Sequence, residues 1–162
     1  MSNVTEIKLK KTEFIPFLDT SGGATDATWK RIARSTIFSL NPSPQTESLD
    51  YISTEIPVEE VKNYIPELPQ ETALYEGDPI YDFMFQKFYE LPVGSACVVP
   101  ALICFGGTSK KAWRCNATLV LGELNTVDGK LSFTIKFGGN IDRGTYTITD
   151  GSPVFEAETA SE

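Results

Sequence analysis

Two runs of alternating side chains in the second half of the chain constrain its fold more than any other feature. Apolar residues fall on every second position of residues 113–121 and again of residues 131–137, with mostly polar residues between them. A period of two places the apolar side chains on one face of a β-strand. Asp128-Gly129 lies between the runs and supplies the backbone conformation of a hairpin turn. We therefore predict an antiparallel hairpin with one buried face.

Further extended segments predict a mainly β chain, a β-sandwich or barrel with long loops. Residues 145–149 follow Gly138-Gly139-Asn140 and predict a third strand that continues the hairpin as a meander. Other expected strands are residues 29–40, which alternate poorly, and residues 53–64, 67–75 and 96–105. Residues 41–48 contain two prolines, which lack an amide donor, so we expect a long excursion from the sheet there.

One helix is expected over residues 79–91. Asp78 is a favoured N-cap residue, and Pro79 fits the first helical position. Two apolar stripes follow at helical spacing, whereas a surface helix needs only one. The second stripe is either buried by long loops or in contact with another subunit. The first stripe is Ile80, Phe83, Met84, Phe88 and Leu91, and the second is Tyr81, Phe85 and Tyr89.

The length of 162 residues fits a single domain with a substantial core. We expect an N-terminal arm over residues 1–28, a β domain over residues 29–149 and an acidic C-terminal tail over residues 150–162. The arm holds a short apolar cluster beside a flexible, glycine-containing tract. Its residues Phe14, Ile15 and Phe17 are candidates for docking on another subunit.

The composition excludes several classes of function. The chain has no histidine, which removes the commonest general base and the commonest metal ligand. Its formal net charge of -8 disfavours a nucleic-acid-binding surface. Asp78 and Asp82 are explained by helix capping and the helix dipole, and the Gly106-Gly107 segment lacks the spacing of a phosphate loop. We expect no enzyme activity, no cofactor and no metal site.

The chain shows no secretory signal and no apolar stretch long enough to span a bilayer, so we expect a protein made in the cytoplasm without membrane contact. In that reducing compartment Cys97, Cys104 and Cys115 are expected to be buried thiols. With a symmetric turn between them, Cys104 and Cys115 would face each other across a hairpin as paired small apolar side chains.

The negative charge is concentrated in two segments. Residues 47–90 carry a net charge of -9 and residues 150–162 carry -4, whereas residues 1–46 carry +2 and residues 91–149 carry +3. One interpretation is a solvated face with a disordered tail. The other is an oligomer in which the basic flanks of one subunit meet the acidic segment of the next.

Motifs in the middle of the chain carry a family resemblance. They are Tyr51-Ile52 with Glu55, Asn63-Tyr64-x-Pro66, Glu71-Thr72-x-Leu74-Tyr75, and Gly77-Asp78-Pro79-Ile80-Tyr81-Asp82-Phe83 leading into the helix. Their order and spacing, over about residues 29–149, resemble the major tail proteins (tail tube subunits) of long-tailed bacteriophages of Gram-positive hosts.

The resemblance implies the phage tail tube fold, a β-sandwich or barrel with one helix. It implies a structural subunit of the virion tail that assembles into hexameric rings, which stack into a tube. The implied partners are further copies of the chain and the tape measure, tail tip and tail terminator proteins. DNA would pass through the tube at ejection without specific binding.

The acidic middle segment acquires a role in such a tube. A wall of carboxylates repels the duplex and keeps it centred in the channel. We predict that Glu55, Glu59, Glu67 and Glu71 face the lumen. The alternative function is a secreted or virion-displayed β-sandwich module that binds a carbohydrate or a receptor and remains monomeric.

Overall fold

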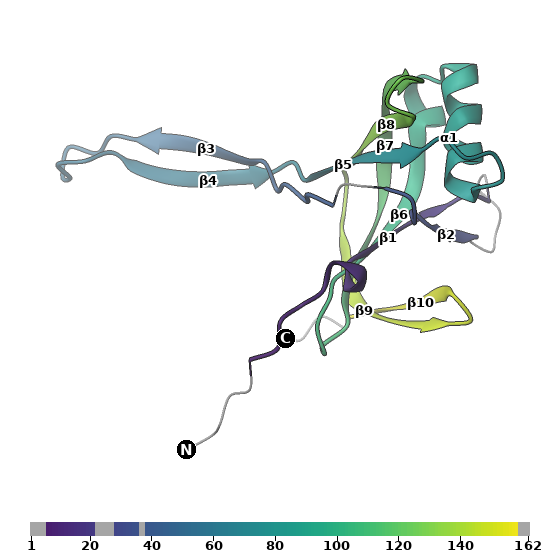
Figure 1. Cartoon of the computed structure of the whole chain (residues 1–162). Helices are drawn as coiled ribbons and strands as arrows, with labels where there is room; N and C mark the ends of the chain where they lie inside the picture. The colour runs from purple at the N-terminus through teal and green to yellow at the C-terminus, as the bar shows by residue number, and fades with distance from the viewer. Residues whose placement is uncertain (1–5, 22–27, 36–37, 159–162) are drawn as a thin grey trace.

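The computed structural model describes residues 6–21, 28–35 and 38–158. This part of the chain forms ten strands, one α-helix and two short 3-10 helices (Figure 1). The expectation of a mainly β chain with one helix is confirmed. The elements are η1 (Lys11–Glu13), β1 (Ile15–Asp19), β2 (Trp29–Arg31), β3 (Pro44–Leu49), β4 (Val58–Tyr64), β5 (Glu67–Ala73), α1 (Pro79–Glu90), η2 (Gly94–Cys97), β6 (Val98–Cys104), β7 (Lys111–Asn125), β8 (Lys130–Phe137), β9 (Asp142–Thr149) and β10 (Ser152–Ala157).

Eight of the strands form one antiparallel sheet around the 15-residue strand β7. The path through the sheet is β10-β9-β7-β6-β1-β2, and β8 and β5 branch from β7 in the order β7-β8-β5. The strands β3 and β4 form a separate two-stranded sheet. Strand β10 returns to contact β2, so the end of the sheet that holds β9, β10, β1 and β2 curls on itself.

The predicted hairpin is present as β7 and β8. Leu119 lies opposite Ile135, and Leu121 lies opposite Phe133. Gly129 in the turn has a φ of 71°, a conformation that glycine adopts without strain. The predicted meander is wrong, because β9 does not pair with β8. Instead β8 and β9 occupy successive stretches of the same edge of β7, with β9 beside its first residues, Lys111 to Arg114.

The N-terminal arm prediction needs correction, because part of this segment is a central strand. Strand β1 lies between β6 and β2, with Phe17 opposite Leu102 on one side and Arg31 on the other. Ile15 and Phe17 are only 7% and 1% exposed, and Phe14 contacts the ring of Phe38 at 5.8 Å between centroids. The cluster therefore docks on its own domain, and Ile15 and Phe17 are not available to another subunit.

Two further boundaries differ from the sequence expectation. The segment predicted as a free acidic tail contributes strand β10, which pairs with β9 from Ser152 to Ala157. Strand β2 covers only Trp29–Arg31 of the extended segment expected over residues 29–40. Residues 22–27 of the predicted arm and 159–162 of the predicted tail lie outside the described residues.

Helix α1 covers one face of the β5-β8-β7-β6 part of the sheet (Figure 1). Asp78 is its N-cap, with Oδ1 accepting a hydrogen bond from the Ile80 amide at 3.1 Å, and Pro79 is its first residue, as predicted. Ile80 and Met84 are fully buried against sheet residues such as Leu68 and Ile135. Leu91 ends the helix in the left-handed conformation, with φ 52°.

A second, smaller cluster lies on the opposite face, inside the curled end of the sheet. It contains Phe17, Leu102, Cys104 and Tyr146. The sheet is thus covered on both faces at this end, which explains why four consecutive residues of β6, Ala101 to Cys104, are fully buried. Towards β5 and β8 only the helix-covered face is buried.

Candidate assembly surfaces

The β3-β4 hairpin projects from the domain as an isolated arm (Figure 1). Its ten or so residues from base to tip span roughly 30 Å at about 3.3 Å per residue. Every residue from Asp50 to Ile65 is exposed. A lone two-stranded hairpin is marginally stable in water, so this arm lacks the packing that usually fixes such an element.

No other part of the described chain packs over the following apolar side chains, which lie on the hairpin. Ile52 and Ile56, at the tip, are 107% and 75% exposed, and Tyr51 beside them is 52% exposed. Val61 and Tyr64 nearer the base are 47% and 58% exposed. Sequence reasoning missed these residues as a surface. The sequence feature that could have revealed them is a set of apolar residues in a Pro- and Glu-rich segment. Their spacing fits neither strand nor helix periodicity.

Charge on the hairpin is partly compensated near its middle and uncompensated elsewhere. Glu47 lies directly opposite Glu60, and without a nearby cation the two carboxylates would repel each other. A bulge after Gln45 places Lys62 beside both, at 2.8 Å from Glu47 Oε2 and 3.6 Å from Glu60 Oε2. Among the described residues, no cation forms an ion pair with the remaining carboxylates of the hairpin, Asp50, Glu55 and Glu59.

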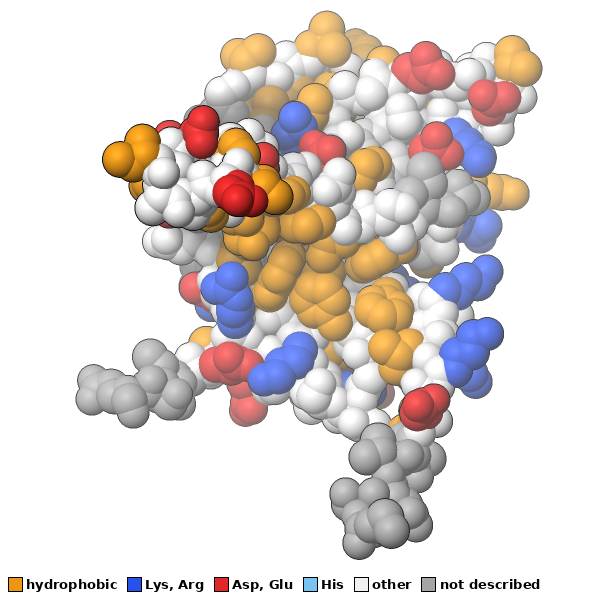
Figure 2. Space-filling model, turned by 90° about the vertical axis from the view of Figure 1, so that its left-hand side faces the viewer, with side chains coloured by type: hydrophobic (Ala, Val, Ile, Leu, Met, Phe, Trp, Pro, Cys, Tyr) orange, Lys and Arg blue, Asp and Glu red, His pale blue; other side chains and the backbone are white. Residues whose placement is uncertain are grey.

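A hollow of about 490 Å³ lies at the base of the hairpin. Trp113 and Ile141 contribute from the domain, Tyr64 and Pro42 from the hairpin base, and Arg143 is at its edge. Figure 2 looks along the hairpin and shows hydrophobic side chains gathered beneath it, with Lys and Arg side chains around them. Arg143 is exposed and has no ion pair within the described part of the chain.

The second face of the β5-β8-β7-β6 sheet is polar and open. We call it the polar face. Its side chains lie at alternate positions of the four strands and are exposed or half-buried. They are Glu67, Pro69 and Glu71 of β5, Lys130, Ser132, Thr134 and Lys136 of β8, Asn116, Thr118 and Val120 of β7, and Val98 and Pro100 of β6.

The four glutamates predicted to face a lumen are not brought together. Glu55 and Glu59 lie on the hairpin, whereas Glu67 and Glu71 lie on the polar face. The Glu67 carboxylate is 4.0 Å from Lys136 Nζ, and that of Glu71 is 3.5 Å from Lys130 Nζ. Sequence reasoning missed both lysines, since only the register of β5 and β8 reveals the pairing.

The second aromatic stripe of α1 forms a row along the helix surface. The ring centroids of Tyr81 and Phe85 are 5.9 Å apart, and those of Phe85 and Tyr89 are 6.4 Å apart. Phe85 is 41% exposed and Tyr89 is 76% exposed. The loops of the described chain therefore do not bury the outer part of this row.

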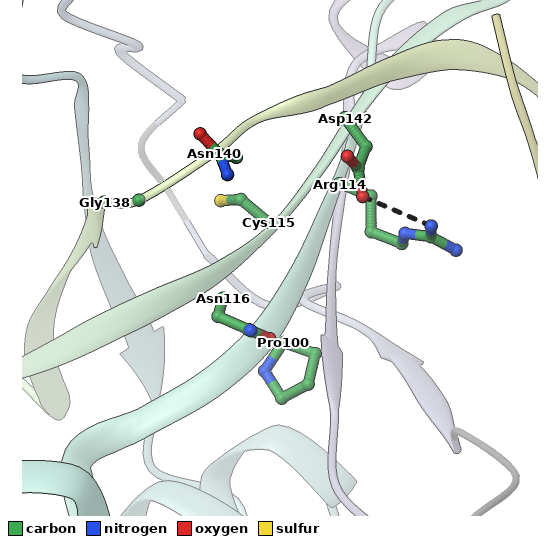
Figure 3. A pocket seen from close by; sticks show the side chains of 8 residues that line it. Pro100, Arg114, Cys115, Asn116, Gly138, Asn140 and Asp142 are labelled. Atoms are coloured by element: carbon green, nitrogen blue, oxygen red, sulfur yellow. Dashed lines mark hydrogen bonds and ion pairs between the residues drawn. The ribbon is translucent and has the colours of Figure 1, made fainter. Parts of the chain in front are cut away.

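Another hollow, of about 370 Å³, lies between β6, β7 and the turn at Gly138 (Figure 3). On one side of it, Arg114 Nη2 is 3.3 Å from Asp142 Oδ2. Cys115 lies in its wall, and burial, together with the nearby charge of Asp142, raises its pKa to about 12. The thiol is therefore neutral near pH 7 and a poor nucleophile.

The cysteines do not pair as the symmetric-turn expectation required. Cys115 lies opposite Ala101, and Cys104 lies opposite Ala112. All three thiols are free. Cys104 and Cys115 are buried as predicted, whereas Cys97 is half-buried, with its Sγ donating a hydrogen bond to the Pro92 carbonyl at 3.1 Å.

Within residues 6–21, 28–35 and 38–158 there is no helix with the length and apolar character to cross a membrane. The same residues contain no group of three or more Cys, Asp or Glu side chains arranged to hold a metal ion.

No protein-family model matches the chain, and no curated protein matches it in sequence. A chain in the cryo-EM structure of the anti-feeding prophage baseplate, 6-fold symmetrised, is similar in structure, with a TM-score of 0.44 and 9% sequence identity. The match covers 90% of this chain and 97% of that chain.

Proposed function

We propose that this chain is a structural subunit of a phage tail tube, which assembles with copies of itself into hexameric rings that stack in the virion tail. The observation that carries the proposal is the β3-β4 hairpin. Within the described residues its strands pack mainly against each other, and it exposes apolar side chains along its length. Such an arm gains stability when another molecule covers it.

The resemblance of the central motifs to tail tube subunits is the basis for proposing stacked hexameric rings as the form of the assembly. A closed ring also removes sheet edges, which otherwise invite uncontrolled pairing. Helix α1 lies on the other side of the domain from the hairpin (Figure 1), and its row of Tyr81, Phe85 and Tyr89 gives a second apolar surface. Two separated surfaces are what a subunit needs to contact neighbours on both sides.

The polar face supports a role as the wall of the channel. Most of its side chains are polar, and its two carboxylates lie beside two ammonium groups, so its four charged residues sum to zero. DNA would pass such a wall with little attraction, because lysines that already neighbour carboxylates gain less from a phosphate. In this proposal Glu67 and Glu71 line the lumen, and the protein acts without catalysis, cofactor or metal.

Electron microscopy of the purified full-length protein tests the proposal. Rings with six subunits, or tubes built from them, are the expected result, with the polar face inward. Monomers that persist at high concentration would overturn the proposal in favour of a binding module for a carbohydrate or a receptor. Co-purification with the tape measure, tail tip or tail terminator proteins of the same virion would identify the other proposed partners.

A further inference from the structure

We infer that the tip of the β3-β4 hairpin of one copy fills the hollow at the hairpin base of a neighbouring copy, with the hairpin carboxylates beside Arg143. The inference deepens the proposed function and rests on it. It assigns the acidic charge of the hairpin to contacts between subunits.

The tip of the hairpin cannot reach the hollow at the base of the same hairpin. Tyr64 and Pro42, at the base of the hairpin, form part of the hollow. The tip residues Ile52 and Ile56 lie roughly 30 Å away along a two-stranded ribbon. The hairpin would have to fold back on itself to fill its own hollow, which would break the β3-β4 pairing. A second copy meets no such obstacle.

The two surfaces match in polarity. Ile52, Ile56 and Tyr51 at the tip are apolar and exposed, and the hollow offers Trp113 and Ile141 as an apolar floor. Burial of these side chains against each other removes apolar surface from water at both ends of the contact.

The two surfaces also match in charge. Residues 44–64 carry five carboxylates and one lysine, and Asp50, Glu55 and Glu59 have no ion pair within the described chain. Arg143 at the hollow likewise has none. A second copy supplies each surface with the opposite charge that its own chain lacks.

The contact is head to tail, because it joins two different surfaces. Heterologous contacts generate rings when the rotation closes and helical filaments when it does not. Each copy then donates one tip and accepts one, so the same contact repeats through the assembly.

Two variants test the pairing in the full-length protein. The tip variant combines Ile52→Ser with Ile56→Ser, and the hollow variant is Arg143→Glu. All three side chains are exposed, so both variants should fold, which near-UV circular dichroism checks. We expect each variant alone to associate roughly 30-fold or more weakly than the wild type in analytical ultracentrifugation. The matched control is Arg31→Glu, the same charge reversal at an exposed residue of β2, which should assemble like the wild type.

Mixing the two variants distinguishes this pairing from other contacts. The hollow variant retains a working tip and the tip variant retains a working hollow, so a 1:1 mixture should form heterodimers through this contact, which neither variant forms alone. A mixture that stays monomeric would show that the two surfaces do not bind each other. If both variants assemble like the wild type, the inference is wrong while the proposed function stands. A wild-type chain that stays monomeric overturns the proposed function and the inference together.

Discussion

Glu67 on β5 lies directly opposite Lys136 on β8, with its Oε2 4.0 Å from Lys136 Nζ. Further along the same two strands, Glu71 Oε2 is 3.5 Å from Lys130 Nζ. These side chains are about a third to a half exposed, so the pairs contribute little to the free energy of folding. The pairs instead determine the charge that the polar face presents, because each of its lysines has a carboxylate at its side.

Replacing both carboxylates in a Glu67→Gln/Glu71→Gln variant should make the polar face adhere to DNA. The change leaves Lys130 and Lys136 facing phosphate without a neighbouring negative charge. We expect binding of duplex DNA that weakens steeply with salt, with a slope of about 0.9 in log-log form for each phosphate contact. Fluorescence anisotropy over a range of NaCl concentrations measures it.

The control for this variant is Glu76→Gln/Glu156→Gln, which removes the same charge from exposed positions outside the polar face. It should leave DNA affinity close to that of the wild type. Equal affinity of both variants for DNA would show that overall charge, and not the polar face, governs attraction.

The aromatic row of α1 should be needed for assembly but not for folding. Phe85→Ser/Tyr89→Ser changes two exposed side chains, so we expect the free energy of unfolding to stay within about 0.5 kcal/mol per substitution and assembly to be lost. Met84→Ala, on the buried side of the same helix, should cost about 2–5 kcal/mol. Denaturant unfolding and electron microscopy separate the two effects. A large loss of stability in the Phe85/Tyr89 variant would instead make the row part of the core.

The local patterns of the sequence predicted β7, β8 and α1, because each has one buried face and a clear start or turn. Strand β1 escaped prediction for a physical reason. All five of its residues are buried, so Ile15-Pro16-Phe17-Leu18 shows no alternation and reads as an apolar anchor. Its place between β6 and β2 depends on pairing with residues more than 80 positions away, which no local period encodes.

The candidate site was less predictable than the fold. The aromatic row on α1 follows from helical spacing alone, and the structure adds that the described loops leave Phe85 and Tyr89 exposed. The neutralised charge of the polar face depends on the β5-β8 register, and the hollow at the hairpin base joins Trp113, Ile141 and Tyr64 from three strands or loops. The prolines of residues 41–48 favoured a loop, yet Pro44 opens strand β3, a position where proline loses no ladder hydrogen bond.

The N-cap of α1 should contribute measurably to stability. The Asp78 side chain is only 7% exposed, and its Oδ1 accepts a hydrogen bond from the Ile80 amide while its Oδ2 lies 3.8 Å from Arg34 Nε. Asp78→Ala removes the acceptor and should lower the free energy of unfolding by about 1 kcal/mol. Asp78→Asn keeps an acceptor oxygen and should cost less. Chemical denaturation measures both, and equal losses would assign the effect to the charge near Arg34.

The three thiols should differ in reactivity. Burial raises the pKa of Cys104 and of Cys115 to about 12, so both are protonated and shielded at pH 8. Cys97 is half-buried and should be the thiol that reacts with a mild thiol reagent in the native protein. Mass spectrometry of the labelled protein should show one modification in buffer and three in denaturant. Native labelling of Cys104 or Cys115 would show that the sheet opens there.

The free energy of unfolding should fall at acid pH because Asp19, at the end of β1, becomes protonated. This residue is 6% exposed. Burial alone would raise the pKa of Asp19, but hydrogen bonds to Oδ1 from the amides of Ser21 and Thr28, both at 2.9 Å, outweigh it and lower the pKa below its ordinary value of 3.8. A lowered folded-state pKa means that ionised Asp19 stabilises the fold above pH 3.8, and that this stabilisation is lost as the pH falls through the folded-state value.

The variant Asp19→Asn isolates this contribution, because it keeps a side-chain acceptor and removes the ionisation. The wild type should be more stable than the variant at pH 6, and the difference should shrink as the pH falls below about 4. Urea unfolding at several pH values measures the difference. Because the carboxylate ties the end of β1 to the start of β2 through Thr28, a difference that stays constant with pH would mean that the two amides stabilise the loop without favouring the charged form.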